Sequence, residues 1–190
     1  MSRVCRIILI CEGWRDSRFA RSFLLESVDA RKIESKVNPG GSGHDWVKNE
    51  FVEAVADLQR FREGRGVLGL LDEDGQGAAS RRNEVAERLA ARGLPPLDDA
   101  GGRCLLLPVR NLETWLYWLE SHRCGRGWNI NEQEDYKTNR PDGISEKDTN
   151  ELCGRAGTFL HTLNHTNPPS GCPPMLALAL RQLRAFMGAF

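Results

Sequence analysis

Short apolar segments alternate with amphipathic segments over the first two thirds of the chain. The apolar segments span residues 4–10, 33–37, 67–71 and 104–109, and each has the length of one buried strand. Apolar residues recur at helical spacing in the segments between and after them, at 14–28, about 44–62, 78–91 and 111–121. Strands that alternate with helices form a parallel sheet with helices on both faces. The sequence therefore predicts an α/β fold with a mostly parallel sheet flanked by helices.

The chain changes character after Cys124. Residues 125–151 are polar and charged, and we expect a long loop or flap with little core there. Helices are expected at about 145–163 and at 175–187, where apolar residues again recur at helical spacing. We therefore divide the chain into a domain of residues 1–123 and a loop and helical extension, residues 124–190, packed on it.

Composition excludes several classes of protein. No apolar run approaches the roughly 20 residues that a membrane helix needs, and the run at 7–11 is short for a secretion signal, so we expect a cytoplasmic protein without membrane contact. The six cysteines include no C-x-x-C pair, so disulfides are not expected. The 26 basic and 26 acidic residues balance, so a nucleic-acid site would have to be a local basic patch.

Acidic residues follow two of the predicted strands. Glu12 follows the first strand, and Asp72 and Asp74 follow the third. The carboxyl ends of parallel strands share one edge of the sheet, and side chains two residues apart on an extended segment point the same way. If the first and third strands are neighbours, the three carboxylates repel unless a cation neutralises them or one of them holds a proton. A divalent cation such as Mg²⁺ is the natural resolution. If the strands are separated, each acid is a solvated turn residue.

The same two motifs resemble a known family. CEGWRD at 11–16 and LLDEDGQGA at 70–78 look like the TOPRIM domain of topoisomerases, primases and OLD-type nucleases. The closest resemblance is to small stand-alone TOPRIM-like proteins found near mobile elements and phage-defence genes, and it covers about residues 4–120. It implies a TOPRIM-like, Rossmann-like fold and a nuclease that cleaves DNA or RNA with Mg²⁺ or Mn²⁺. It leaves the oligomeric state open.

The resemblance also implies roles for individual acids. Asp72 and Asp74 would hold the metal, and Glu12 would be either a metal ligand or a general acid/base. Asp16 lies one helical turn beyond Glu12 and is a candidate auxiliary ligand. Glu113 is followed two residues later by a tryptophan, as in a subset of the family, and could complete a second metal site. Its alternative role is that of an acid at a helix N-terminus, stabilised by the helix dipole.

Several residues are candidates for contact with nucleic acid. Arg81, Arg82 and Arg110 each closely follow the end of a predicted strand and could bind phosphate, although any one of them could instead lie on a solvated face. The glycine-rich loop at 38–44 is either a substrate-facing loop or an ordinary turn, and His44 at its end could contact phosphate. Because the net charge is zero, a partner protein such as an ATPase could help to deliver the substrate.

The tryptophans form one further pattern in the sequence, and a set of cysteines and histidines forms another. Trp14, Trp115 and Trp118 lie at helical spacing, so we expect them to anchor the core; Trp128, in the polar loop, is the candidate for base stacking. Cys153, His161, His165 and Cys172 include zinc-binding residue types, but their spacing matches no common zinc module.

Two other functions compete with the nuclease. A phosphatase that resembles the haloacid dehalogenase family also has D-x-D after an apolar strand, but that family places the pair on its first strand. A non-catalytic TOPRIM-like subunit that binds an ATPase or a toxin is the third hypothesis, and the presence of all three acids weighs against it.

Overall fold

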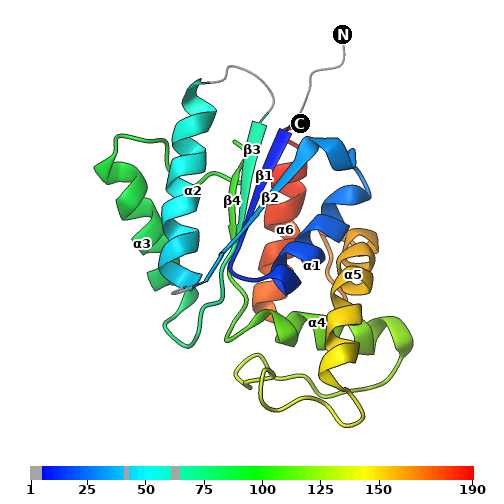
Figure 1. The fold of residues 1–190 in the computed structure, drawn as a ribbon. Coiled ribbons are helices and arrows are strands. Elements are labelled where there is room, and N and C mark those ends of the chain that lie inside the picture. Colours follow the sequence, from blue (N-terminus) through cyan, green and yellow to red (C-terminus); the bar gives the residue numbers. More distant parts are fainter. Residues whose placement is uncertain (1–5, 41–42, 61–64) are drawn as a thin grey trace.

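The computed structural model describes residues 6–40, 43–60 and 65–190. Its sheet is fully parallel and has the strand order β2-β1-β3-β4 (Figure 1). The strands are β1 (Arg6–Cys11), β2 (Ile33–Val37), β3 (Arg65–Leu70) and β4 (Arg103–Leu106). Cys11, the last residue of β1, pairs with Val37 on one side and Leu70 on the other. The predicted α/β, Rossmann-like class is confirmed, and the first and third strands are neighbours.

Helices cover both faces of the sheet (Figure 1). On one face lie α2 (Gly43–Arg60) and α3 (Ala78–Ala91). On the other face lie α1 (Trp14–Leu25), α4 (Leu112–Cys124), α5 (Glu146–Thr162) and α6 (Pro174–Met187). Successive residues of β1 enter the two cores in turn: Leu9 packs with the second group of helices and Ile10 with the first. A strand that is buried on both faces has a continuous apolar sequence, as RIILIC does.

The C-terminal residues share a core with the sheet. Leu160 of α5 and Leu180 of α6 belong to the same buried cluster as Leu9 of β1. The loop between α4 and α5 adds a smaller cluster, in which the buried ring of Tyr136 lies 5.7 Å from the ring of Tyr117 in α4. The extension is therefore built onto the face of the sheet that α1 and α4 cover.

The observed elements differ from the predicted ones mainly at their ends. β4 ends at Leu106 rather than at Val109, because Pro108 has no N–H group to donate to a neighbouring strand. Predicted strand residues 4 and 5 and predicted helix residues 61 and 62 lie outside the described residues. Within the described ranges, the helices are too short or too polar to cross a bilayer.

Helix α5 has two glycines, Gly154 and Gly157, whose positions face α1. A β-carbon added at Gly157 would collide with the backbone carbonyl of Phe19, whereas one added at Gly154 would lie 3.5 Å from Arg18 Nε, an ordinary contact. We predict that Gly157→Ala lowers the free energy of unfolding by about 1–3 kcal/mol through overpacking. Gly154→Ala should raise it by about 0.5–1 kcal/mol, because alanine favours the helix. Urea unfolding measures both, and equal stabilisation by the two substitutions would contradict this packing.

Candidate active site

The carboxyl ends of β1 and β3 lie beside a pocket of about 340 Å³. Five carboxylates face this pocket. Two follow the ends of β1 and β3, and the other three lie in α1, α4 and α5. The lining residues are Glu12, Gly13, Trp14, Arg15, Asp16, Asp72, Glu113, Lys137 and Glu146. Of the acids that the sequence analysis proposed, Glu12, Asp16, Asp72 and Glu113 lie here together, and Asp74 is not among the lining residues.

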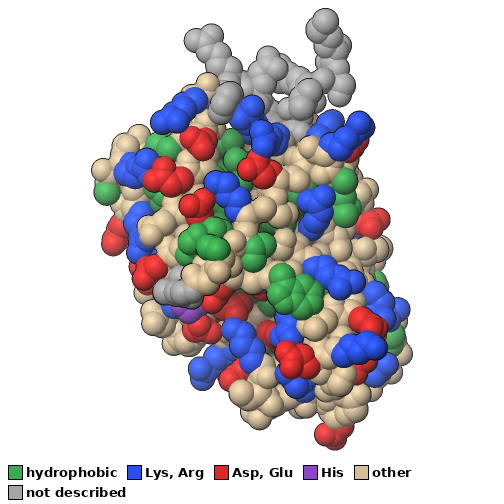
Figure 2. Space-filling model, in the orientation of Figure 1, with side chains coloured by type: hydrophobic (Ala, Val, Ile, Leu, Met, Phe, Trp, Pro, Cys, Tyr) green, Lys and Arg blue, Asp and Glu red, His purple; other side chains and the backbone are tan. Residues whose placement is uncertain are grey.

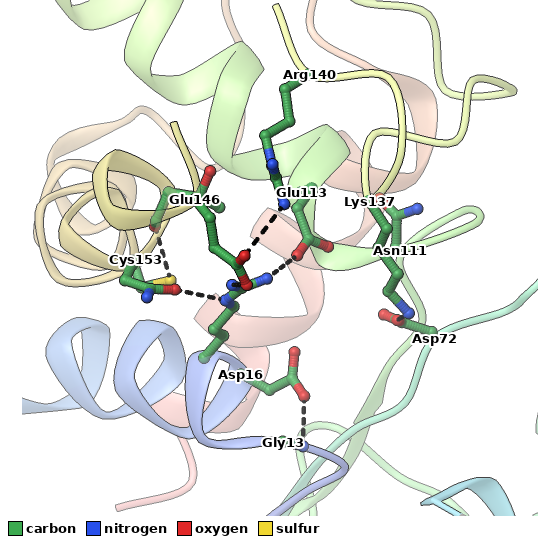
Figure 3. A network of polar contacts seen from close by, with 12 residues as sticks. Gly13, Asp16, Asp72, Asn111, Glu113, Lys137, Arg140, Glu146 and Cys153 are labelled. Carbon is green, nitrogen blue, oxygen red and sulfur yellow. Dashed lines mark hydrogen bonds and ion pairs between the residues drawn. The ribbon is translucent and has the colours of Figure 1, made fainter. Parts of the chain in front are cut away.

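Asp16 and Asp72 are the acids whose protonation this pocket changes most. Burial raises the pKa of Asp72, and the nearby Asp16 raises it further. Asp16 opens onto the pocket but is otherwise enclosed by protein, and this desolvation raises its pKa to about 7. The N–H of Gly13 donates to Asp16 Oδ2 over 2.7 Å and partly opposes that shift (Figure 3). One of these acids can therefore hold a proton near neutral pH in the metal-free protein.

Lys137, in the polar loop between α4 and α5, supplies a positive charge to the pocket. Its ammonium donates to Asp72 Oδ2 over 2.7 Å (Figure 3). Desolvation alone would lower the pKa of Lys137, but the carboxylates around it, Asp72 foremost, raise it. Lys137 lies 65 positions from Asp72 in the sequence, and no motif or periodicity in the polar loop indicates the contact.

Arg15 forms ion pairs with two other acids of the pocket, Glu113 and Glu146. Its guanidinium donates to Glu113 Oε1 over 3.0 Å, to Glu146 Oε1 over 2.7 Å and to Asn150 Oδ1 over 2.6 Å. Glu113, at the start of α4, is 4% exposed. Arg15 thus joins α1 to α4 and α5, and the second metal site proposed at Glu113 would share that carboxylate with Arg15.

Glu12 lies at the N-terminal end of α2. A β-carbon at Gly43 would collide with the Glu12 side chain, so glycine is required there for this approach. His44 Nε2 lies 3.4 Å from Glu12 Oε2 and 2.7 Å from Asp74 Oδ2, but neither contact has hydrogen-bond geometry. Within the described residues, Glu12 Oε2 is therefore a buried carboxylate oxygen without a hydrogen-bond partner. The glycine-rich loop itself is described only in part, since residues 41 and 42 lie outside the described residues.

Asp72 and Asp74 lie beyond the end of β3 and are not both part of an extended segment. β3 ends at Leu70, and Asp74 has a left-handed backbone with φ of 50°. The carboxylate of Glu73, between them, accepts a hydrogen bond from the N–H of Gly77 before α3. The expectation that alternation makes the two aspartates point the same way is therefore wrong, because the turn has begun: Asp72 faces the pocket and Asp74 contacts His44.

The three arginines proposed for phosphate contacts have different surroundings. Arg81 is 4% exposed and lies 3.6 Å from Glu84 and 3.5 Å from His44 Nδ1. Arg82 donates to the carbonyl oxygen of Leu105 over 3.4 Å and lies 3.8 Å from Asp99, neither of which lines the pocket.

Arg110 is the arginine that remains available. It is exposed, has φ of 58°, and lies over Gly75, where an added β-carbon would come within 3.0 Å of its Nη1. In the described part of the chain its guanidinium has no hydrogen bond or ion pair, so among the three it is the best placed to accept a phosphate.

The carboxylate oxygens in the pocket are of the kind that binds a divalent cation, but they do not converge on one point. Among residues 6–40, 43–60 and 65–190, no three His, Cys, Asp or Glu side chains converge as a ready metal site. However, Glu12 Oε2 lacks a partner, and the pKa values of Asp16 and Asp72 are raised, which are the conditions that an added cation relieves. Oxygen ligands are those that Mg²⁺ or Mn²⁺ prefers, so the residues fit such an ion if Lys137 yields its place at Asp72.

The tryptophans and the zinc candidates can now be placed. Trp115 and Trp118 are buried as expected, but the prediction that Trp14 anchors the core is wrong, because its side chain is 50% exposed. Trp128 packs edge-on against Tyr117. Cys153 donates to the carbonyl oxygen of Thr149, and His161 hydrogen-bonds Ser27, so neither is arranged with the other as a metal ligand.

No protein-family model, curated protein or solved structure matches this chain. Inferences about its function therefore depend on the geometry of this pocket.

The raised pKa of Asp16 predicts a pH-dependent stability. A carboxyl whose folded pKa is about 7 against an ordinary 3.8 destabilises the fold fully above pH 7, and the effect disappears as pH falls towards 4. Asp16→Asn, in which the amide oxygen can still accept from Gly13, should therefore stabilise the protein at pH 8. We expect about 1–2 kcal/mol, less than the full value per pKa unit because the side chain opens to solvent. Chemical unfolding in EDTA at pH 8 and pH 5 measures this, and a gain that is larger at pH 5 would contradict the assignment.

Proposed function

We propose that this chain is a metal-dependent nuclease of TOPRIM type that hydrolyses phosphodiester bonds in DNA or RNA. The observation that supports the proposal is the pairing of β1 with β3, with Cys11 opposite Leu70. It places Glu12 and Asp72 after the ends of neighbouring parallel strands, and both line one pocket with Asp16. The shared pocket of Glu12 and Asp72 supports the proposal, although Asp74, the second acid of the D-x-D motif, is not among its lining residues.

The chain's own residues supply distinct parts of the chemistry. When bound, Mg²⁺ or Mn²⁺ would activate water and offset charge on the phosphate, and Asp72, Asp16 and Glu12 would hold it. Asp16 Oδ1 is free of the Gly13 hydrogen bond, so this oxygen would either bind the ion directly or accept a proton from water. Lys137 and Arg110 provide positive charge towards the phosphate. Glu12 retains both of its proposed roles, ligand and general acid/base.

The distribution of charge over the surface bears on how strongly the chain alone would bind nucleic acid. Figure 2 shows basic and acidic side chains interspersed on the face that it draws, which accords with the formal net charge of zero. Nucleic-acid affinity then depends on a few local contacts, since non-specific binding scales with the number of phosphates neutralised. This supports a partner protein, such as an ATPase in a defence system, that brings the substrate to the pocket.

The proposal predicts metal-dependent cleavage that depends on the pocket acids. Purified protein with Mg²⁺ or Mn²⁺ should cleave labelled single-stranded or duplex DNA or RNA, and EDTA should stop the reaction. Glu12→Gln and Asp72→Asn should each lower the rate by at least about 100-fold, because they remove negative charge that holds the cation. The matched control is Asp57→Asn, an exposed acid paired with Arg60 on α2, which should cleave like the wild type.

Other outcomes separate the competing functions. Hydrolysis of a small phosphate ester without cleavage of nucleic acid would favour the phosphatase. If the protein does neither with either metal, but binds an ATPase subunit equally well in wild-type and Asp72→Asn forms, the chain is a non-catalytic partner. The ion pair between Lys137 and Asp72 is the feature that would favour this last case.

Lys137 and a divalent cation should compete for Asp72. We predict that Lys137→Met lowers the stability of the metal-free protein at pH 8 by about 1–2 kcal/mol, because Asp72 loses its counter-ion. Saturating Mg²⁺ should then raise the melting temperature more in this variant than in the wild type. Thermal unfolding with EDTA or Mg²⁺ measures both. An equal or smaller response to Mg²⁺ in the variant would show that the ion does not bind at Asp72.

A further inference from the structure

An exposed aromatic ring stands at the carboxylate pocket. Four large hydrophobic side chains of the described residues are exposed: Trp14, Leu25, Leu178 and Phe190. Trp14 is the one of these that lines the pocket, and it is also the most exposed of the four, at 50%. Single exposed apolar residues are common on proteins, but an indole beside a cluster of acids leaves a large apolar face in water with no packing role.

Trp14 lies beside the cation of its neighbour Arg15. It is the first residue of α1 and directly follows Gly13, whose N–H binds Asp16. The guanidinium carbon of Arg15 lies 5.9 Å from the centre of the Trp14 ring, within the range of a cation–π contact. Arg15 is in turn fixed by three hydrogen bonds to α4 and α5. The ring therefore lies at the pocket next to a guanidinium whose own position is fixed.

We propose that Trp14 stacks on an unpaired base of the substrate, next to the phosphate that the pocket acids would act on. This inference rests on the proposed nuclease function and narrows its substrate to single-stranded nucleic acid or an unpaired segment. Bases in a duplex are stacked on each other and offer no free face, whereas an unpaired base offers its face to an aromatic ring. Stacking on one ring tolerates every base, so the site should show little sequence preference.

The position of the ring agrees with such a role. Trp14 lines the same pocket as Glu12 and Asp16, so a base stacked on it would place its phosphate at the pocket that these acids face. Arg15 is already paired with Glu113 and Glu146, so little of its positive charge is left to attract a phosphate. Trp128 was the expected stacking residue, but it packs against Tyr117 and Arg126 and is not among the residues that line this pocket.

Binding measured without cleavage tests the inference. Fluorescence anisotropy of a labelled dT oligonucleotide, with Ca²⁺ in place of Mg²⁺, would compare the wild type with Trp14→Ala, Trp14→Phe and Trp14→Leu. We expect roughly ten- to hundredfold weaker binding for Trp14→Ala and Trp14→Leu, and near wild-type binding for Trp14→Phe, which keeps an aromatic face. Duplex binding should be the same for all four proteins. Leu25→Ala, at the exposed C-terminal end of the same helix, is the matched control and should bind like the wild type.

Two further measurements, with an rU oligonucleotide and with tryptophan fluorescence, complete the test. An rU oligonucleotide in parallel shows whether RNA or DNA is the better source of the unpaired base. Wild-type tryptophan fluorescence should be quenched by the oligonucleotide more than that of Trp14→Phe. The inference is overturned if Trp14→Ala binds single strands like the wild type, if it loses duplex binding equally, or if Trp14→Leu binds normally. It is also overturned if the wild type binds no oligonucleotide while a protein partner protects Trp14.

This experiment can fail separately from the proposed function. Metal-dependent cleavage that is lost in Asp72→Asn but has an unchanged KM for single strands in Trp14→Ala would keep the nuclease and reject the stacking role. Single-strand binding that depends on Trp14, without cleavage under any metal, would keep the stacking role and reject the nuclease. Thermal unfolding of each variant confirms that the fold is intact before either comparison.

Discussion

Repulsion between carboxylates is the constraint on which this site depends. The parallel pairing of β1 with β3 brings Glu12 and Asp72 to one pocket, and α1 and α4 add Asp16 and Glu113. Cations from elsewhere in the chain relieve part of the repulsion. The 124–190 extension supplies the ammonium at Asp72, and α5 supplies two of the acceptors that fix Arg15 beside Glu113. The extension is therefore part of the site as well as part of the core.

The sequence was sufficient to predict the layers of the fold and the edge at which the acids gather. Apolar runs of strand length identified the strands, and helical spacing placed the helices with errors mostly at their ends. Strand order was not predictable, because several orders of four parallel strands satisfy the same pattern. The adjacency of β1 and β3 decides whether Glu12 meets Asp72, and it required the three-dimensional structure.

The contacts of single side chains were the least predictable. Lys137 lies in a polar loop without periodicity, so nothing in its sequence surroundings distinguishes it from other exposed lysines. Helical spacing assigned Trp14 to the buried face of α1, but Trp14 is the first residue of that helix, lines the pocket and is 50% exposed. The prediction that Asp74 points the same way as Asp72 was wrong because side chains alternate only within a strand, and β3 ends before these residues.

The residues of this pocket neutralise its carboxylates only in part. Lys137 hydrogen-bonds Asp72 and its charge also lowers the pKa of Asp16, but burial still holds that pKa near 7. Among the described residues, Glu12 Oε2 has no hydrogen-bond partner. A structural salt bridge would be expected to pair its acids more completely, because unpaired buried carboxylates lower stability. Incomplete pairing is instead common at functional sites, where the destabilised groups gain their missing interactions from a bound ion or substrate. The unsatisfied acids, more than the resemblance of the motifs, distinguish this sheet edge from an ordinary acidic turn.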